Sequence, residues 1–480
     1  MNNANTITAP RAGGSRDADG SSCRARVAVV GAGPAGLYAV ESLLESSSGI
    51  SVDVFDRLPT PYGLVRYGIA PDNQKMKSVE RVLSRVFGNE GQVRLVGNVC
   101  FGTDVTRADL LRHYDAVIYA TGAQTERRLG VPGEDLPGSF GAKDFVDWYN
   151  GHPDAADRNF HLHAKCVAVI GAGNVALDVA RVLTRGADEL ASTDVPDRVL
   201  DTFRNSQITD VHLIARRGPV QAKFTPVELR GLGNLLNADV VIRPEEILLT
   251  DDDEIQIGSN RELRTNVEML REWARRPIQG KARRIHIRFL RRPVRILGES
   301  RVEGILLESN EQIAHEQVRG TGIFETLKVD MVFRSVGYRA LRLLDVPFDE
   351  ARSVIPHDQG RVLDENGQLT DREYVTGWAK RGPCGTVGTN RSDSAETVSR
   401  MLAVLATRRT CNGSDSEQIL ALLNSRGVNY TNWMNWQRLD DHEIQLGRGQ
   451  GRPRVKIPDL RSMLELSRHS SAHGLAANPD

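Results

Sequence analysis

Cysteine is scarce in this chain, and the way it is placed argues against several classes of protein. The five residues, Cys23, Cys100, Cys166, Cys384 and Cys411, are scattered and form no C-x-x-C pair. This argues against a disulfide scaffold, a zinc site, a bound iron–sulfur cluster and a dithiol-relay reductase. We therefore expect no metal site in the chain and a reduced, cytoplasmic setting.

Long hydrophobic runs and a net charge are also missing. No apolar run approaches the roughly 20 residues of a membrane-spanning helix. Lys plus Arg and Asp plus Glu number 62 each, so no overall field favours nucleic acid or an anionic membrane. Residues 1–23 lack the apolar core of a secretory signal and are expected to be a disordered leader. Residues 466–480 are expected to be a loose tail.

What the sequence does contain is a glycine-rich fingerprint. Gly31, Gly33 and Gly36 follow the apolar strand expected at 27–30 and open an expected helix. In G-x-G-x-x-G the first glycine allows a tight turn, the second lets a pyrophosphate approach the backbone, and the third lets the helix pack on the strand. The next expected strand ends at Asp56, where an acid can hold a ribose hydroxyl.

The same pattern recurs later in the chain. CVAVIGAGNVALDVARVL at 166–183 has the G-x-G-x-x-A form of the fingerprint. The strand that follows ends in Arg216 and Arg217, not in an acid. Two guanidinium groups at this place favour the 2′-phosphate of NADP. Two fingerprints indicate two dinucleotides bound by one chain, or a second unit that is a weakly decayed duplicate of the first.

These units predict an α/β fold with two Rossmann-like domains, one inserted in the other. The first domain is expected at 24–125 and 331–465, and the inserted domain at 126–330. The expected helices include 77–87, 143–150, 261–275 and one that starts at Ser392 or Asp393 and runs through Ala406.

A basic stretch, KARRIHIRFLRRPVR, occupies 281–295. Its alternation of apolar and charged residues predicts a strand with one wet face. Two interpretations stay open: a solvated face, or a docking patch for an acidic protein.

Several motifs together resemble the ferredoxin–NADP⁺ reductases of the adrenodoxin-reductase type, in their actinobacterial form. The resemblance covers about residues 25–465, and its motifs include VGAGPAGLYA at 30–39, TPYGLVRYGIAPD at 60–72, VIGAGNVALDVARVL at 169–183, ARRGPVQAKFTPVELR at 215–230 and GWAKRGPCGTVGTN at 377–390.

The resemblance implies a discontinuous FAD domain with an inserted NADPH domain. It further implies a reaction in which a hydride passes from NADPH to the flavin, and single electrons then pass to a ferredoxin. It also favours the interpretation of 281–295 as a ferredoxin-facing surface.

The positions that match the family's FAD site are Gly31, Gly33, Ala35, Gly36, Asp56, Leu64, Val99, Trp378, Gly385, Thr386 and Val387. Those that match its NADPH site are Ala172, Gly173, Asn174, Val175, Arg216, Arg217 and Glu228, with Gly385 near the nicotinamide. Hydride transfer between two cofactors needs orientation more than acid–base chemistry, so we nominate no catalytic residue.

This chain departs from the family pattern at three positions. Asp56 stands where the family usually has Glu, Asn73 where many members have His, and Cys384 where Thr is usual. The shorter Asp56 needs a closer approach to the ribose. Asn73 argues against a required protonating role at that position, and Cys384 is expected to be a small neighbour of the flavin.

Three other functions share some of these features. A flavin monooxygenase also carries two fingerprints, but its usual signature between them is not evident. An electron-input subunit of a larger complex, as in glutamate-synthase-like assemblies, carries an N-terminal cysteine cluster, whereas only Cys23 is present here. A nucleotide-binding sensor without enzymatic activity does not need two cofactor sites and an arginine pair.

Overall fold

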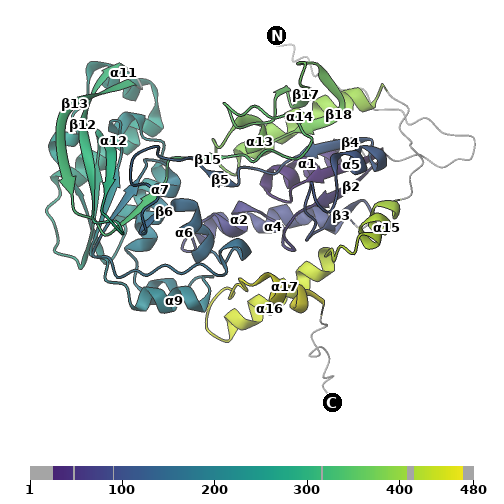
Figure 1. Cartoon of the computed structure of the whole chain (residues 1–480), viewed down its shortest axis with the longest axis horizontal. Coiled ribbons are helices and arrows are strands. Elements are labelled where there is room, and N and C mark those ends of the chain that lie inside the picture. Colours follow the sequence, from purple (N-terminus) through teal and green to yellow (C-terminus); the bar gives the residue numbers. More distant parts are fainter. Residues whose placement is uncertain (1–24, 47–48, 90, 315–316, 408–415, 469–480) are drawn as a thin grey trace, which may run out of the picture.

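The computed structural model describes residues 25–46, 49–89, 91–314, 317–407 and 416–468. The leader expected at 1–23 and residues 469–480 lie outside this part of the chain. The described residues form two lobes that lie side by side (Figure 1), each built on a mostly or wholly parallel β-sheet.

The first lobe contains a seven-stranded sheet in the order β16-β17-β18-β4-β1-β2-β3. β18, β4, β1, β2 and β3 pair in parallel, and β16 and β17 add an antiparallel edge. The central strand β1 is buried along its whole length, as expected for a parallel strand covered on both faces. The strands are β1 (Ala25–Val30), β2 (Ile50–Phe55), β3 (Val93–Val96), β4 (Ala116–Tyr119), β16 (His357–Asp358), β17 (Arg361–Leu363) and β18 (Leu369–Val375).

Helices cover both faces of this sheet. On one face Leu37 and Val40 of α1 pack with Val398 and Met401 of α14, and on the other Leu110 of α5 lies in the core. The helices of the first lobe are α1 (Pro34–Ser46), α2 (Leu64–Tyr67), α3 (Gln74–Lys77), α4 (Glu80–Leu83), α5 (Arg107–His113), α13 (Trp378–Arg381), α14 (Thr389–Leu405), α15 (Gln418–Ser425), α16 (Trp433–Arg448) and α17 (Leu460–Arg468).

The second lobe contains a six-stranded, all-parallel sheet in the order β6-β14-β7-β8-β10-β9. Its strands are β6 (Ser139–Gly141), β7 (Cys166–Ile170), β8 (Asp210–Ile214), β9 (Ala238–Ile242), β10 (Arg283–Arg288) and β14 (Met331–Arg334). Its helices are α6 (Ala142–Tyr149), α7 (Asn174–Leu183), α8 (Ala187–Leu190), α9 (Asp197–Arg204), α10 (Pro226–Gly233), α11 (Asp251–Ser259) and α12 (Arg261–Arg275).

An antiparallel sheet of three strands covers part of this lobe. It consists of β11 (Arg291–Leu297), β12 (Gly304–Ala314) and β13 (Gln317–Leu327). Ile296 and Ile305 from this layer pack against Ala168 and Ile214 of the parallel sheet. The single strand expected within 281–295 is therefore two strands that belong to different sheets.

The chain crosses between the lobes twice, and the two crossings pair with each other. β5 (Thr125–Glu126) runs antiparallel to β15 (Tyr338–Arg339). The boundary expected at residue 331 is wrong, because β14 pairs in parallel with β6 and β7 of the second sheet. The chain returns to the first lobe only at β15, since the apolar run at 331–334 completes the second sheet first.

Three other expectations differ from the structure in their limits. The helix expected at 77–87 is broken into α3, α4 and a 3₁₀ turn at Ser84–Gly88. The helix expected to start at Ser392 or Asp393 starts at Thr389, because Asp393 does not cap it but binds Gly377 N (2.6 Å). Residues 466–468, expected to belong to a loose tail, form the end of α17, which continues through Arg468; the rest of the expected tail lies outside the described residues.

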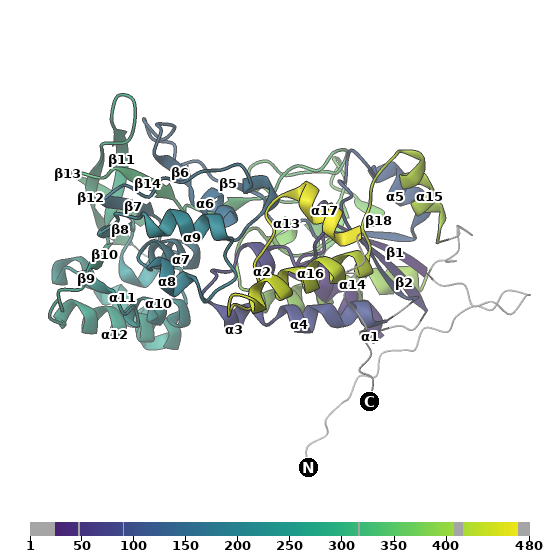
Figure 2. The same cartoon turned by 90° about the horizontal axis from the view of Figure 1, so that it is seen from below.

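The C-terminal helices α16 and α17 lie against the first lobe (Figure 2). A buried ion pair joins them to the connector after β2: Arg66 donates two hydrogen bonds, of 2.6 and 2.8 Å, to Glu443. Both side chains are almost completely buried, at 1% and 0% exposure. The guanidinium of Arg66 also lies over the rings of Tyr67 and Trp436.

We predict that Glu443→Gln destabilises the protein, because it leaves the Arg66 charge buried without a counter-charge. The expected loss in the free energy of unfolding is about 3 kcal/mol. Urea denaturation of the protein measures this loss. Asp441→Asn, on the exposed side of the same helix, is the matched control and should leave the unfolding midpoint unchanged. Equal stability of both variants would contradict a structural role for this pair.

Candidate functional site

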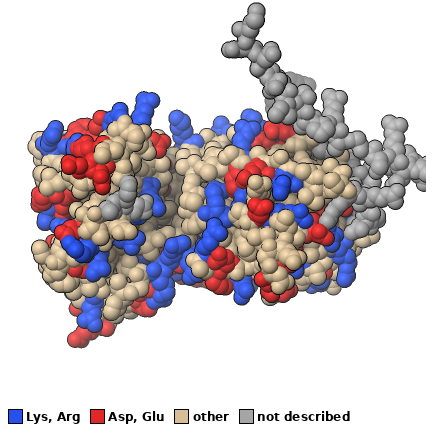
Figure 3. All heavy atoms as spheres, turned by 90° about the horizontal axis from the view of Figure 1, so that it is seen from above, with Lys and Arg blue, Asp and Glu red and all other residues tan. Residues whose placement is uncertain are grey.

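A large cleft runs between the two lobes, with a volume of about 1330 Å³. Its walls come from the carboxyl ends of strands in both parallel sheets and from the loops that follow them. This is where open α/β sheets bind nucleotides. In Figure 3 the two lobes meet at a waist, and basic and acidic side chains are interspersed over both.

In the first lobe, the loop between β1 and α1 has the geometry that the fingerprint predicts. Gly31 has a φ of +112°, and a Cβ there would lie 2.5 Å from Ala120 O. A Cβ on Gly36 would lie 2.0 Å from Gly31 O, so α1 can pack this closely only without a side chain. A Cβ added to Gly33 would have its nearest heavy atom 4.0 Å away, so there is room for a phosphate in front of this glycine.

Asp56 holds this loop in place. Its Oδ2 accepts a hydrogen bond from Ala32 N (2.8 Å), and its Oδ1 accepts one from Leu58 N (2.9 Å). Burial raises the pKa of Asp56, and the two backbone bonds oppose that rise. Each carboxylate oxygen can accept a second hydrogen bond, so the side chain can support the loop and still meet a ribose hydroxyl at the cleft.

The third glycine-rich segment, 377–390, closes the cleft on the first-lobe side. Gly377 has a φ of +73°, and a Cβ there would lie 2.5 Å from Ala35 Cβ, so this segment packs directly on the first fingerprint. Trp378 Nε1 donates to Cys384 O (3.1 Å), and its ring stacks on Tyr338 at 5.7 Å. Cys384 is exposed, with its thiol near carbonyl oxygens of its own loop.

In the second lobe, the loop between β7 and α7 repeats the arrangement. A Cβ on Gly171 would lie 2.2 Å from Ser335 O, whereas a Cβ on Gly173 would meet nothing within 4 Å. Gly173 caps α7 without a side-chain hydrogen bond. The Asn174 side chain accepts from Thr225 N (2.9 Å). The amide groups at the start of α7 therefore face open space, as a phosphate site requires.

Arg216 and Arg217 follow β8 at the same edge of the sheet. Arg216 is exposed and Arg217 is half-buried. Their backbone carbonyls are fixed from the neighbouring strands: Asn310 Nδ2 donates to Arg216 O (2.7 Å), and Leu290 N donates to Arg217 O (3.2 Å). The arginine pair thus has a rigid backbone beneath it.

A layer of polar side chains joins the lobes at the cleft. Asn73 donates to Glu228 (3.1 Å), and Asp72 accepts from Arg181 (2.7 and 3.0 Å) and from Arg185 (2.8 Å). Burial by itself would raise the pKa of Asp72, but the two arginines lower it. Asn73 therefore contacts Glu228, a residue expected at the NADPH site, from the opposite lobe.

Two acids that line the cleft have unusual pKa values. Burial raises the pKa of Asp178 to about 7, although Arg181 pairs with it. Burial likewise raises the pKa of Glu126 to about 7, opposed by a hydrogen bond from Lys143 N. Both groups can change charge near neutral pH.

The structure brings the predicted site residues together. All of those named from the sequence line this one cleft except Gly36, which lies behind the loop: Gly31, Gly33, Ala35, Asp56, Leu64, Val99, Ala172, Gly173, Asn174, Val175, Arg216, Arg217, Glu228, Trp378, Gly385, Thr386 and Val387. The sequence reasoning missed Thr121 and Tyr338, which also line it. Each follows a strand of a parallel sheet closely, so the rule that ligands bind at the carboxyl ends of strands could have identified them.

The basic stretch 281–295 offers less uncompensated positive charge for docking a partner than its composition suggests. Arg288 is buried and pairs with Glu246 (2.9 Å) and Glu325 (2.6 Å). Arg284 pairs with Asp210 (2.8 Å), and Arg292 with Glu308 (2.5 Å). Much of its positive charge is therefore compensated within the lobe.

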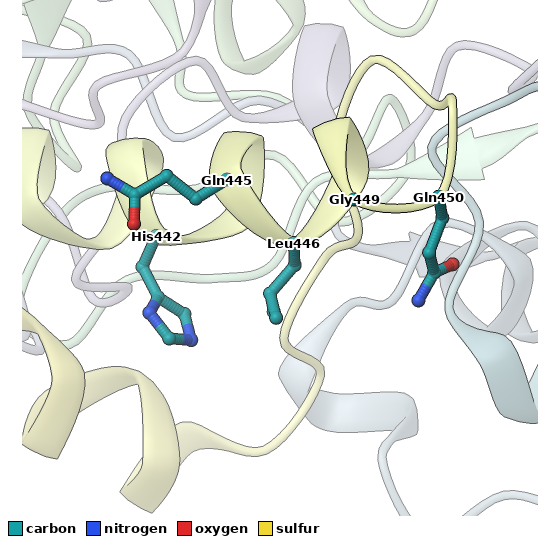
Figure 4. Close-up of a pocket in the computed structure, with 5 residues that line it drawn as sticks. All are labelled: His442, Gln445, Leu446, Gly449 and Gln450. Carbon is teal, nitrogen blue, oxygen red and sulfur yellow. The ribbon is translucent and has the colours of Figure 1, made fainter.

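A second hollow, of about 390 Å³, lies at the end of α16 (Figure 4). It is lined by His442, Gln445, Leu446, Gly449 and Gln450, all from one helix end and the turn after it. No side chain from another element completes it, so we do not regard it as a functional site.

Among the described helices, none combines the length and the apolar character needed to cross a bilayer.

Known proteins resemble this chain in sequence and in fold. The family model for pyridine nucleotide-disulphide oxidoreductases matches residues 25–232. The chain is 40% identical over 452 residues to the NADPH-ferredoxin reductase FprA of Mycobacterium leprae, covering 92% of this chain and 98% of that protein. It is 37% identical to the mitochondrial NADPH:adrenodoxin oxidoreductase of Arabidopsis thaliana, with 91% and 94% covered.

The solved structure of Mycobacterium tuberculosis FprA in complex with NADPH is also similar. It superposes with a TM-score of 0.88 at 39% identity, covering 92% of this chain and 99% of that one. The fold and the cleft thus define a two-domain oxidoreductase with two dinucleotide-binding sites. Within that class, the chain belongs to the family of NADPH-ferredoxin reductases that includes FprA and NADPH:adrenodoxin oxidoreductase.

We predict that Gly36→Ala greatly reduces the amount of FAD that stays bound on purification. The added Cβ would lie 2.0 Å from Gly31 O, so α1 and the loop must separate. The flavin absorbance per protein measures the effect. Gly88→Ala, whose Cβ would meet nothing within 4 Å, is the control and should retain the cofactor. Full flavin content in Gly36→Ala would show that the loop tolerates the shift.

Proposed function

We propose that this chain is an FAD-containing reductase that passes electrons from NADPH to a ferredoxin-type iron–sulfur protein. The observation that carries this proposal is one cleft with a fingerprint loop on each side. One loop is anchored by an acid, and the other leads to two arginines. The reductase activity of the family supports the same assignment.

The first lobe has the features needed to hold FAD. Gly31, Gly33 and Asp56 would receive the adenosine diphosphate part, because a phosphate fits in front of Gly33 and Asp56 offers acceptors to a ribose. Trp378 and the loop 385–387 would border the ring system at the other end of the cleft. Bound FAD supplies the chemistry of accepting a hydride and giving up single electrons.

The second lobe has the features needed to hold NADPH. The uncapped start of α7 and the open space at Gly173 suit a pyrophosphate. Arg216 and Arg217 suit the 2′-phosphate, which distinguishes NADPH from NADH. Glu228, held by Asn73 and Arg181, would position the nicotinamide end.

The residues of this chain orient the two cofactors and need not move a proton. Glu228 is held by an amide and a guanidinium, neither of which is a proton donor suited to neutral pH. Asn73 and Asp72 from the first lobe also fix the distance between the lobes. These residues therefore favour the transfer by proximity and orientation, because two bound groups held together react as if in one molecule.

For the ferredoxin, the part of 281–295 that can take part in docking is its exposed edge. Arg295 is exposed and has no ion pair among the described residues. The neighbouring Pro293 lines the cleft, so β11 borders the entrance to the site. A positive group at that edge suits an acidic partner.

We expect Arg216→Ala combined with Arg217→Ala to raise the KM for NADPH by about a hundredfold, as two lost charge-assisted contacts of about 1.5 kcal/mol each imply. The KM for NADH should change little, because NADH has no 2′-phosphate. Steady-state ferricyanide reduction with each nucleotide measures both values. A parallel rise for both nucleotides would overturn the assignment of this pair.

Arg295→Glu should weaken reduction of cytochrome c through ferredoxin, with the KM for ferredoxin rising about fivefold at low salt. Ferricyanide reduction should be unaffected, because it needs no docked protein. Arg461→Glu, exposed on α17 in the first lobe, is the matched charge reversal. If both variants behave alike, β11 is not part of the docking surface.

A further inference from the structure

Lys223 lies beside the second fingerprint loop. Its backbone N donates to Ala172 O (2.7 Å), which forms a bridge between Gly173 and Lys223. Two residues later, Thr225 N donates to the Asn174 side chain (2.9 Å). These two hydrogen bonds fasten the segment 223–225 to the loop, so the backbone of Lys223 cannot move away from it.

The side chain of Lys223 is free to meet a ligand. It is exposed, it lines the inter-lobe cleft, and it makes no ion pair or side-chain hydrogen bond within the described part of the chain. This contrasts with Lys77, Lys143 and Lys380, which all pair with acids. An unpaired ammonium fixed beside a phosphate-sized opening is suited to bind a phosphate.

We infer that Lys223 binds the pyrophosphate of NADPH and so acts as a third cationic residue of the nucleotide site. The bridge places Lys223 opposite Gly173, at the start of α7, where the backbone amide groups face open space. Arg216 and Arg217, by contrast, follow the end of β8. The pyrophosphate carries about two negative charges that the arginine pair does not face. The start of α7 and Lys223 together balance them.

This inference rests on the proposed function, and it predicts a pattern that differs from that of the arginine pair. Lys223→Met keeps the length of the side chain and removes its charge. We expect it to weaken NADP⁺ binding about tenfold, the loss of one charge-assisted contact. Binding of 2′-AMP, which has a 2′-phosphate but no pyrophosphate, should not change. Calorimetric titration of the FAD-loaded protein with each ligand measures both without turnover.

Kinetics give a second readout. The KM for NADPH and the KM for NADH should rise by the same factor in Lys223→Met, because both nucleotides carry the pyrophosphate. Lys223→Arg should restore most of the affinity. Lys165→Met is the matched control: Lys165 is exposed in the same lobe just before β7, at the opposite end of that strand from the fingerprint loop.

Two results would overturn the assignment. One is unchanged NADP⁺ affinity in Lys223→Met. The other is an equal loss for NADP⁺ and 2′-AMP, which would make Lys223 a ligand of the 2′-phosphate. A failure of the unmodified protein to bind NADP⁺ at all would overturn the proposed function together with this inference.

Discussion

The placement of the two lobes depends on a buried ionic junction between Lys77, Asp194 and Lys456. Asp194 accepts from Lys77 (2.6 Å) and from Lys456 (3.0 Å), and Asn150 accepts from both lysines. The two ammonium groups lower the pKa of Asp194 against the effect of burial, and burial lowers that of Lys456. Such a charge cluster is tolerated only when all partners are in place. It therefore permits one arrangement of the connector, the second lobe and the C-terminal segment.

The connector at 57–77 links this ionic junction to the cleft between the lobes. It starts directly after Asp56, which holds the first fingerprint loop, and ends at Lys77 in the junction. Between them, Asp72 and Asn73 reach the helices that carry the second nucleotide site. The distance between the two cofactor sites is thus set by polar contacts from one irregular segment. A long loop with little regular structure beside the cleft thus has a structural role.

The local geometry of both fingerprints could be predicted because a strand, a glycine turn and a helix follow one another within each motif. Gly36 is required by a contact inside its own motif, with Gly31 O, whereas Gly31 and Gly171 are also required by the distant carbonyls of Ala120 and Ser335. The boundary at 331 could not be predicted, because the apolar run at 331–334 suits either parallel sheet and only strand pairing decides between them. The alternation in 281–295 predicts one wet face, but the acidic partners of its arginines lie up to 74 residues away in sequence and cannot be assigned by spacing.

The sequence by itself determined the class of protein and predicted two nucleotide sites, the second with a preference for NADP, since a strand, a glycine turn and the residue after the next strand carry that chemistry locally. Only the tertiary structure decided which charges are free. The charges of Arg288 and Lys77 are compensated by buried acidic partners, whereas the charge of Lys223, beside Gly173, is left to act on a ligand. The physical reason is that a charge acts on a ligand only if no acid from another element already compensates it, and that depends on the packing of distant segments.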